Sequence, residues 1–149
     1  MPINDFDLVF TEFALGATPG QAITATALGN HVLDAGATRG RDWAAGGEIY
    51  KPWLAVRQAF NNLTSLQVDV IASDANDGTG NAVVLSTATI LLASLTLNKN
   101  ITLPGLSPGT YRRFLVGKFT VNGIAPSTGV VWLAVVPADA LPQDNVLAL

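Results

Sequence analysis

The chain contains a single histidine, His31, and this residue limits the catalytic chemistry that the sequence supports. A Ser-His-Asp or Cys-His system needs an imidazole as its general base, so either system has to use His31. The chain has no cysteine and no G-x-S-x-G nucleophile elbow, and His31 lies in a predicted strand near Asp34. We therefore interpret His31 as a structural or surface residue, and we expect no catalytic residues and no enzymatic activity.

Metal-binding patterns are weak as well. Zinc sites use histidine and thiolate ligands, and this chain leaves mainly carboxylates for the purpose. The segment Asp74-Ala75-Asn76-Asp77-Gly78 has oxygen ligands at the density of a calcium loop, but it lacks the downstream glutamate of an EF-hand. A solvated surface loop is the favoured interpretation, and a weak cation site is the alternative. Neither a metal site nor a cofactor is predicted.

Tryptophans and a cationic strand are the remaining candidates for binding. Arg112, Arg113 and Lys118 form a small basic group on one predicted strand, which suits a solvated face or a contact with an acidic partner surface. Trp43 lies in a predicted loop, so its ring must dock on its own domain or on a neighbour. Trp132 lies in the middle of a predicted strand and is expected in the core.

The composition indicates one small domain, residues 1–149, whose surface is partly covered. Only 13% of the residues are charged, against about 25% in ordinary soluble domains, while 49% are hydrophobic. Either Gly, Thr, Ser and Asn solvate the surface, or other subunits cover part of it. We favour the second explanation because several strands are apolar on both faces.

The same composition argues against several partners and destinations. A net charge of -3 provides no basic excess for phosphates, so nucleic acid is not expected as the main partner. The apolar runs are too short to span a bilayer, so no membrane is expected either. Acidic residues stand near the N-terminus where an export signal needs basic ones.

Two neighbouring strands, residues 53–60 and 65–72, are the predicted centre of an all-β fold. Alternate residues from Leu66 to Ala72 are apolar and the residues between them are more polar, which is the two-residue period of a half-buried strand. Residues 61–64 are predicted to be the turn that joins the two strands into a hairpin.

Further strands are expected along the chain, at residues 5–13, 21–34 with a kink at Gly29-Asn30, 82–86, 101–103, 111–122 and 129–136. Residues 35–47 are expected to be loop, and residues 87–97 suit either a short helix or a strand. The last strand is apolar on both faces, so it is either central with its outer face covered or part of a subunit contact. These features predict an antiparallel β-sandwich, a jelly roll of about eight strands, with extended arms at residues 1–15 and 138–149.

A series of segments follows in a fixed order along residues 21–136: Ile23-Thr24-Ala25-Thr26-Ala27, Val32-Leu33-Asp34, Gly46-Gly47-Glu48, the predicted Phe60 to Val70 hairpin with Thr64-Ser65-Leu66-Gln67-Val68, Tyr111-Arg112-Arg113-Phe114 and Phe119-Thr120-Val121. This order of strand segments resembles the cement or decoration proteins of tailed-bacteriophage capsids. The resemblance depends on strand texture and order, without a catalytic signature.

The resemblance implies a jelly-roll virion protein, made in the host cytoplasm, that binds the outer surface of an icosahedral capsid. Such a protein acts as a homodimer or homotrimer and binds the major capsid protein lattice, with no enzymatic activity. The expected interface residues are Phe6, Phe10, Phe13, Trp43, Arg112, Arg113, Leu141, Val146, Leu147 and Leu149. For the aromatic residues near the N-terminus and the C-terminal residues, packing within the same subunit is the alternative.

A carbohydrate- or receptor-binding jelly roll of a phage tail or fibre is the competing function. It is favoured if Trp43 and Tyr50 line an open groove together with the acids of the segment 74–77.

Overall fold

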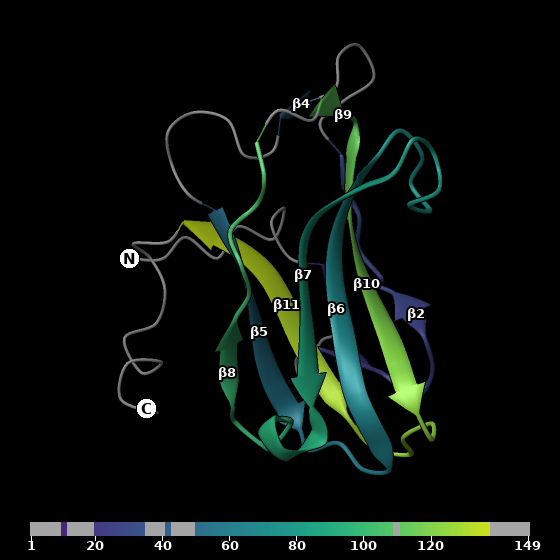
Figure 1. Ribbon diagram of the computed structural model, residues 1–149, viewed down its shortest axis with the longest axis vertical. Coiled ribbons are helices and arrows are strands. Elements are labelled where there is room, and N and C mark those ends of the chain that lie inside the picture. Colours follow the sequence, from purple (N-terminus) through teal and green to yellow (C-terminus); the bar gives the residue numbers. More distant parts are fainter. Residues whose placement is uncertain (1–9, 12–19, 35–40, 43–49, 109–110, 138–149) are drawn as a thin grey trace.

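The computed structural model describes residues 10–11, 20–34, 41–42, 50–108 and 111–137. In these ranges the chain forms antiparallel strands in two facing sheets, so the predicted all-β sandwich is confirmed (Figure 1). Within the described ranges no helix has the length and apolar character needed to span a membrane.

The first sheet, sheet A, has four strands in the order β1-β11-β5-β8. They are β1 (Gln21–Ala22), β11 (Val130–Pro137), β5 (Tyr50–Gln58) and β8 (Asn100–Thr102). The long central pair, β11 and β5, is rich in valine, leucine and tryptophan, residues that pack well on a pleated surface.

The second sheet, sheet B, has the order β2-β10-β6-β7. Its strands are β2 (Ala27–Leu28), β10 (Phe114–Gly123), β6 (Leu63–Ser73) and β7 (Val83–Leu91), and β3 (Leu33–Asp34) pairs with β10 beside β2. The central strands β6 and β10 pair along almost their whole lengths.

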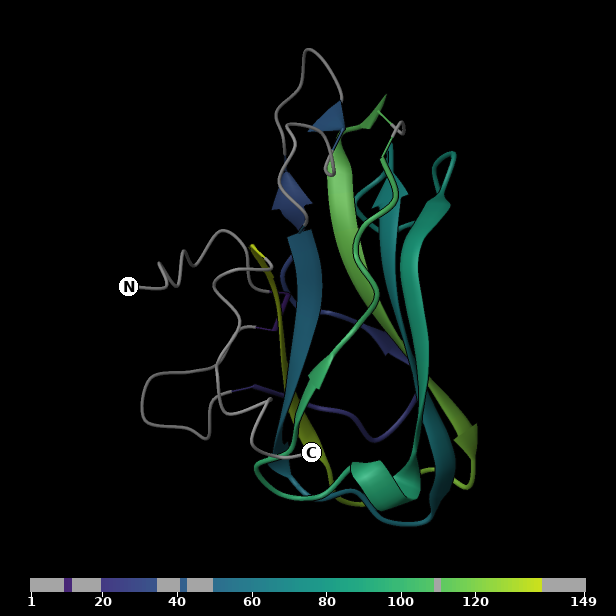
Figure 2. The ribbon, with the colours of Figure 1, turned by 60° about the vertical axis from the view of Figure 1, so that its left-hand side comes forward.

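A short strand pair and a short helix lie at opposite ends of the sandwich (Figures 1 and 2). Strands β4 (Arg41–Asp42) and β9 (Tyr111–Arg112) pair with each other at one end, which we call the β4–β9 end. The 3-10 helix η2 (Leu92–Ser94) lies at the other, which we call the η2 end.

The connections make this sandwich a jelly roll. The chain passes from β1 in sheet A to β2 in sheet B, returns for β5, and crosses again to the neighbours β6 and β7. It then alternates between the sheets through β8, β10 and β11. With β2 and β3 counted as one strand, each sheet has four strands in the interleaved order of two Greek keys.

The predicted hairpin between residues 53–60 and 65–72 is wrong, although both strands exist. β5 pairs with β11 and β8 in sheet A, whereas β6 pairs with β10 and β7 in sheet B. Strands on facing sheets bury their inner side chains against each other, and Leu54 of β5 and Leu66 of β6 lie in one core. Among the described residues, β6 and β7 form a hairpin through the polar segment 74–82.

Three other boundaries differ from the prediction. Residues 21–34 form three two-residue strands because the chain leaves sheet A after Ala22 and joins sheet B at Ala27. The ambiguous residues 87–97 continue β7 to Leu91 and then turn through η2. Strand β4 lies within the predicted loop, and most of the predicted strand 5–13 lies outside the described residues.

Phe10 belongs to the core of its own chain, which corrects its prediction as an interface residue. Its side chain is 0% exposed. Its N–H donates to the carbonyl oxygen of Leu133 at 2.9 Å, and its own carbonyl accepts from the N–H of His31 at 3.0 Å. A Cβ atom at Gly29 would lie 2.6 Å from the Phe10 carbonyl oxygen, so the glycine permits this close approach. Phe10 therefore bridges β11 of sheet A and the β2–β3 segment of sheet B.

Candidate functional surfaces

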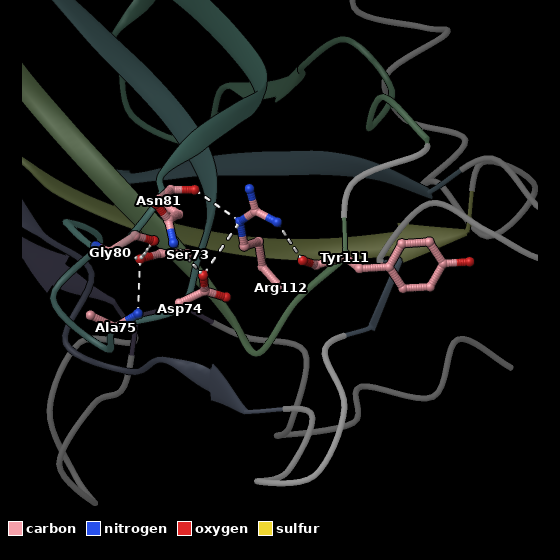
Figure 3. Close-up of polar contacts among 7 residues, drawn as sticks. All are labelled: Ser73, Asp74, Ala75, Gly80, Asn81, Tyr111 and Arg112. Carbon is pink, nitrogen blue, oxygen red and sulfur yellow. Dashed lines mark hydrogen bonds and ion pairs between the residues drawn. The ribbon is translucent and has the colours of Figure 1, made fainter.

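The β6–β7 loop at the β4–β9 end is organised by Ser73 (Figure 3). This buried hydroxyl donates to the carbonyl oxygen of Gly80 at 2.9 Å. The Ser73 hydroxyl oxygen also accepts hydrogen bonds from the N–H groups of Ala75 and Gly80, both at 3.1 Å. Because one side chain satisfies three backbone groups, the loop is closed upon itself at its base.

Arg112 joins this loop to β9. Its Nε donates to the carbonyl oxygen of Asn81 at 2.9 Å and lies 3.8 Å from Oδ2 of Asp74. Its Nη1 donates to the carbonyl oxygen of Tyr111 at 2.7 Å. Asn81 Nδ2 in turn donates to Asp74 Oδ2 at 2.9 Å, so these polar groups form one network.

Arg113 points to a different partner, Asp34 at the end of β3. Its Nε and Nη2 donate to the two carboxylate oxygens of Asp34, each at 2.8 Å, which is the bidentate geometry of a strong ion pair. The hydrogen bond to Asp34 raises the pKa of the Arg113 guanidinium above its ordinary value. The guanidinium also lies 4.7 Å from the centroid of the Phe114 ring.

The predicted basic group is therefore not one patch. Arg112 contacts the β6–β7 loop, Arg113 contacts β3, and Lys118 lies further along β10 opposite Asp69. Whether Arg112 and Arg113 also contact a partner stays a prediction.

The carboxylates of the calcium-like segment bind separate protein donors. Asp77 Oδ1 accepts from the N–H of Thr79 at 3.0 Å and from its hydroxyl at 2.6 Å. The Thr79 hydroxyl, and then its N–H, lower the pKa of Asp77 below the ordinary value. Asp74 is engaged by Asn81 and Arg112. Within the described part of the chain, no three histidine, aspartate or glutamate side chains are grouped to hold a metal ion.

The outer face of sheet A carries a second apolar cluster, separate from the sandwich core. It consists of Ala55, Trp132 and Ala134, with Trp53 packed against them. The two indole rings meet edge to face with centroids 5.0 Å apart and an interplanar angle of 85°. Trp132 was expected in the core, and it is buried at 8% exposure, although in this second cluster and not in the cluster between the two sheets. β11 is thus a central strand with a covered outer face, the first of its two predicted alternatives.

Asp69 on the outer face of sheet B is a buried carboxylate that sequence reasoning did not single out. It is only 6% exposed. Its Oδ1 accepts from the Thr87 hydroxyl at 2.5 Å, and Nε2 of Gln67 lies 3.2 and 3.0 Å from its two oxygens. The nearby β6–β7 loop approaches the same face, since a Cβ at Gly78 would lie 3.8 Å from Val116. The alternation of residues placed Asp69 on the polar face, but nothing in β6 alone signals its burial.

The other predicted site residues have a mixed outcome. His31 is half-buried between β2 and β3, where its backbone binds Phe10. The groove expected for a sugar-binding module depends on Trp43 and the side chain of Tyr50, which the structure does not describe. The predicted interface residues outside the described ranges are Phe6, Phe13, Trp43, Leu141, Val146, Leu147 and Leu149.

A comparison with protein-family models matches residues 17–134 to the family Bbp16. This range includes every strand of the jelly roll except the end of β11. The chain belongs to the Bbp16 family. The Bbp16 match indicates a phage-related family, which agrees with the phage origin that the resemblance implied. No curated protein sequence matches the chain.

Proposed function

We propose that this Bbp16-family protein is a capsid decoration protein. It forms homodimers or homotrimers, binds the major capsid protein lattice on the outside of a phage shell, and stabilises the shell without enzymatic activity. Membership of a phage-related family over nearly the whole jelly roll supports this proposal.

The observation that carries the proposal is that the described candidate side chains bind other groups of the domain. Ser73 and Asp74 fix the β6–β7 loop, and Arg113 fixes the end of β3 through Asp34. Asp69 is bound by its neighbours on adjacent positions of sheet B. These hydrogen bonds and ion pairs tie the loop and the strand end to their own sheet, and a preorganised surface of this kind suits a protein that clamps a lattice.

The outer face of sheet A adds support. Trp53 and Trp132 extend apolar packing beyond the sandwich core, so the domain has two apolar layers. A second layer suits a domain that resists deformation when it holds neighbouring subunits together.

Co-sedimentation with undecorated shells of the same phage tests the proposal. We expect saturable binding, and we expect shells that are already decorated to bind no further protein. Decorated shells should also resist heat better than undecorated shells, since a ligand that binds the assembled state stabilises it. Absence of binding to the undecorated shells contradicts the proposal.

Oligomer formation is tested separately by size-exclusion chromatography with light scattering. The proposal expects a dimer or trimer at micromolar concentration. A monomer at every concentration removes the oligomeric part of the proposal and leaves capsid binding to be judged by sedimentation.

A further inference from the structure

The η2 end of the sandwich is built from three connections that lie together (Figure 1). They are the crossing between β5 and β6, the segment from β7 through η2 to β8, and the connection from β10 to β11. We define the η2 end by residues 57–62, 91–99 and 122–129.

Hydrogen bonds join these three connections into one unit. Asn61 Nδ2 donates to the Ser127 hydroxyl at 2.8 Å, and Asn61 Oδ1 accepts from the N–H groups of Ser127 and Thr128 at 2.9 and 3.2 Å. The N–H of Phe60 donates to the carbonyl oxygen of Leu95 at 3.2 Å, which ties in the segment after η2. The surface is therefore organised before any partner binds, which lowers the entropic cost of binding.

Two of these connections, the one from β7 to β8 and the one from β10 to β11, expose large apolar side chains. Leu91 at the end of β7 is 62% exposed and Leu97 after η2 is 59% exposed. Ile124, directly after β10, is 71% exposed. Val83, Val84 and Tyr111 are also exposed, towards the β4–β9 end, at 37%, 51% and 65%, so exposed hydrophobic residues alone do not distinguish the two ends. The η2 end differs because its exposed apolar residues stand together with charges of a single sign.

The charges at this end have one sign. Arg57 is exposed near the end of β5. Lys99 lies beside this part of β5, because the carbonyl oxygen of Lys99 accepts the N–H of Val56, the residue before Arg57. The three segments of the η2 end contain no aspartate or glutamate. The aspartates of the described residues are in β6 or towards the β4–β9 end, at positions 34, 42, 69, 74 and 77. An apolar surface with cations at its side complements an apolar surface flanked by carboxylates.

We infer that the η2 end is the surface by which the protein attaches to the capsid, and that it contacts an apolar, carboxylate-flanked patch of the major capsid protein. This inference rests on the proposed function and adds the orientation of the domain on the shell. The β4–β9 end, with its ion pairs, then faces away from the shell.

The test compares two sets of variants in the co-sedimentation assay. The first combines Leu91→Thr, Leu97→Asn and Ile124→Asn. The matched control combines Val83→Thr and Val84→Thr, which are exposed residues at the opposite end of β7. The first variant loses three apolar side chains that the shell would cover on binding, so its shell binding should weaken about tenfold or more, while the control binds like the wild type. Unfolding curves establish that both variants remain folded.

The outcomes separate the two proposals. If the wild type binds and the first variant binds equally well, the inference is overturned and the proposed function stands. If the control loses binding as strongly as the first variant, the orientation is overturned. If the wild type itself does not bind, the proposed function fails and the inference fails with it.

Charge reversal tests the carboxylate-flanked patch. Arg57→Glu with Lys99→Glu should weaken binding most at low salt, because screening reduces the contribution of exposed charges. Lys51→Glu, on β5 towards the β4–β9 end, is the control and should have no effect. Equal binding by the double variant and the wild type at low salt overturns the electrostatic part of the inference.

Discussion

Asn61 and Ser127 bind each other through two reciprocal hydrogen bonds, although they are 66 residues apart. Nδ2 of Asn61 donates to the Ser127 hydroxyl at 2.8 Å, and the Ser127 N–H donates to the side-chain oxygen Oδ1 of Asn61 at 2.9 Å. One side chain thereby ties the β5–β6 crossing to the β10–β11 connection. The geometry of the η2 end depends on this contact.

Asn61→Ala should destabilise the domain by about 0.5–1.5 kcal/mol, because it removes the hydrogen bonds that the Asn61 side chain makes with residues 127 and 128, whose backbone donors water can still reach. Urea unfolding measures the change. Asn76→Ala, in the exposed β6–β7 loop, is the control and should stay within about 0.5 kcal/mol of the wild type. Equal unfolding free energies for Asn61→Ala and the wild type would show that the contact contributes nothing.

Phe10→Ala should cost about 3–5 kcal/mol of unfolding free energy, since it opens a cavity between the two sheets. Leu97→Ala removes an exposed side chain and should cost about 0.5 kcal/mol or less. Chemical denaturation at low protein concentration compares the two variants. A Phe10→Ala variant with unchanged unfolding but weaker oligomer formation would return Phe10 to the interface.

The approximate positions of the long strands β5, β6, β10 and β11 could be predicted from the sequence, although the full length of β7 could not. For β5, β6 and β10 the buried face could be predicted too, because burial on one face imposes a two-residue period. The alternate residues from Leu66 to Ala72 are all 0% exposed, as that period requires. Pairing could not be predicted in the same way. Alternation says which face of β5 and β6 is buried, but a hairpin and a crossing between sheets produce the same pattern.

The candidate sites were harder to predict because their partners are distant in the sequence. Arg113 and Asp34 are 79 residues apart. They come together because β3, which ends at Asp34, pairs with the start of β10, directly after Arg113. Asp69 is buried by packing that involves β7 and the β6–β7 loop, so its own strand gives no sign of it. The β-sandwich could be inferred from local patterns, whereas these contacts follow from the jelly-roll connections.

Trp53→Phe should change the unfolding free energy by about 1 kcal/mol or less. The indole N–H of Trp53 is buried and has no hydrogen-bond acceptor among the described residues, and an unpaired buried donor costs about 1–3 kcal/mol. Phenylalanine removes this donor, which offsets its smaller apolar area. Trp132→Ala has no such offset and should cost about 3–5 kcal/mol. Similar losses for both variants would show that the unpaired N–H is not destabilising.

Arg113→Lys should weaken the link between β9–β10 and β3 because an ammonium group cannot make both hydrogen bonds to Asp34. Both side chains are about 40% exposed, so we expect only a small loss of unfolding free energy, because solvent screens an exposed ion pair. A double-mutant cycle with Asp34→Asn measures the coupling at low and high salt. Coupling that is unaffected by salt would contradict an exposed ion pair.

The hydrogen bonds from Thr79 to Asp77 predict a pH dependence of the β6–β7 loop. They lower the pKa of Asp77 in the folded protein, so their stabilising effect is present above the unfolded-state pKa. It is lost as the pH falls through the lower folded-state pKa. A carboxyl titration followed by NMR should place the Asp77 midpoint below that of an ordinary aspartate.

Substitutions at residue 79 separate the causes of that shift. Thr79→Val removes the hydroxyl, which makes the largest contribution, so the Asp77 midpoint should rise towards the ordinary value. Thr79→Ser retains a hydroxyl and should keep the midpoint low. Because the backbone N–H of residue 79 still binds Asp77, part of the shift should remain in Thr79→Val. A midpoint that is identical in the two variants would assign the whole shift to the backbone.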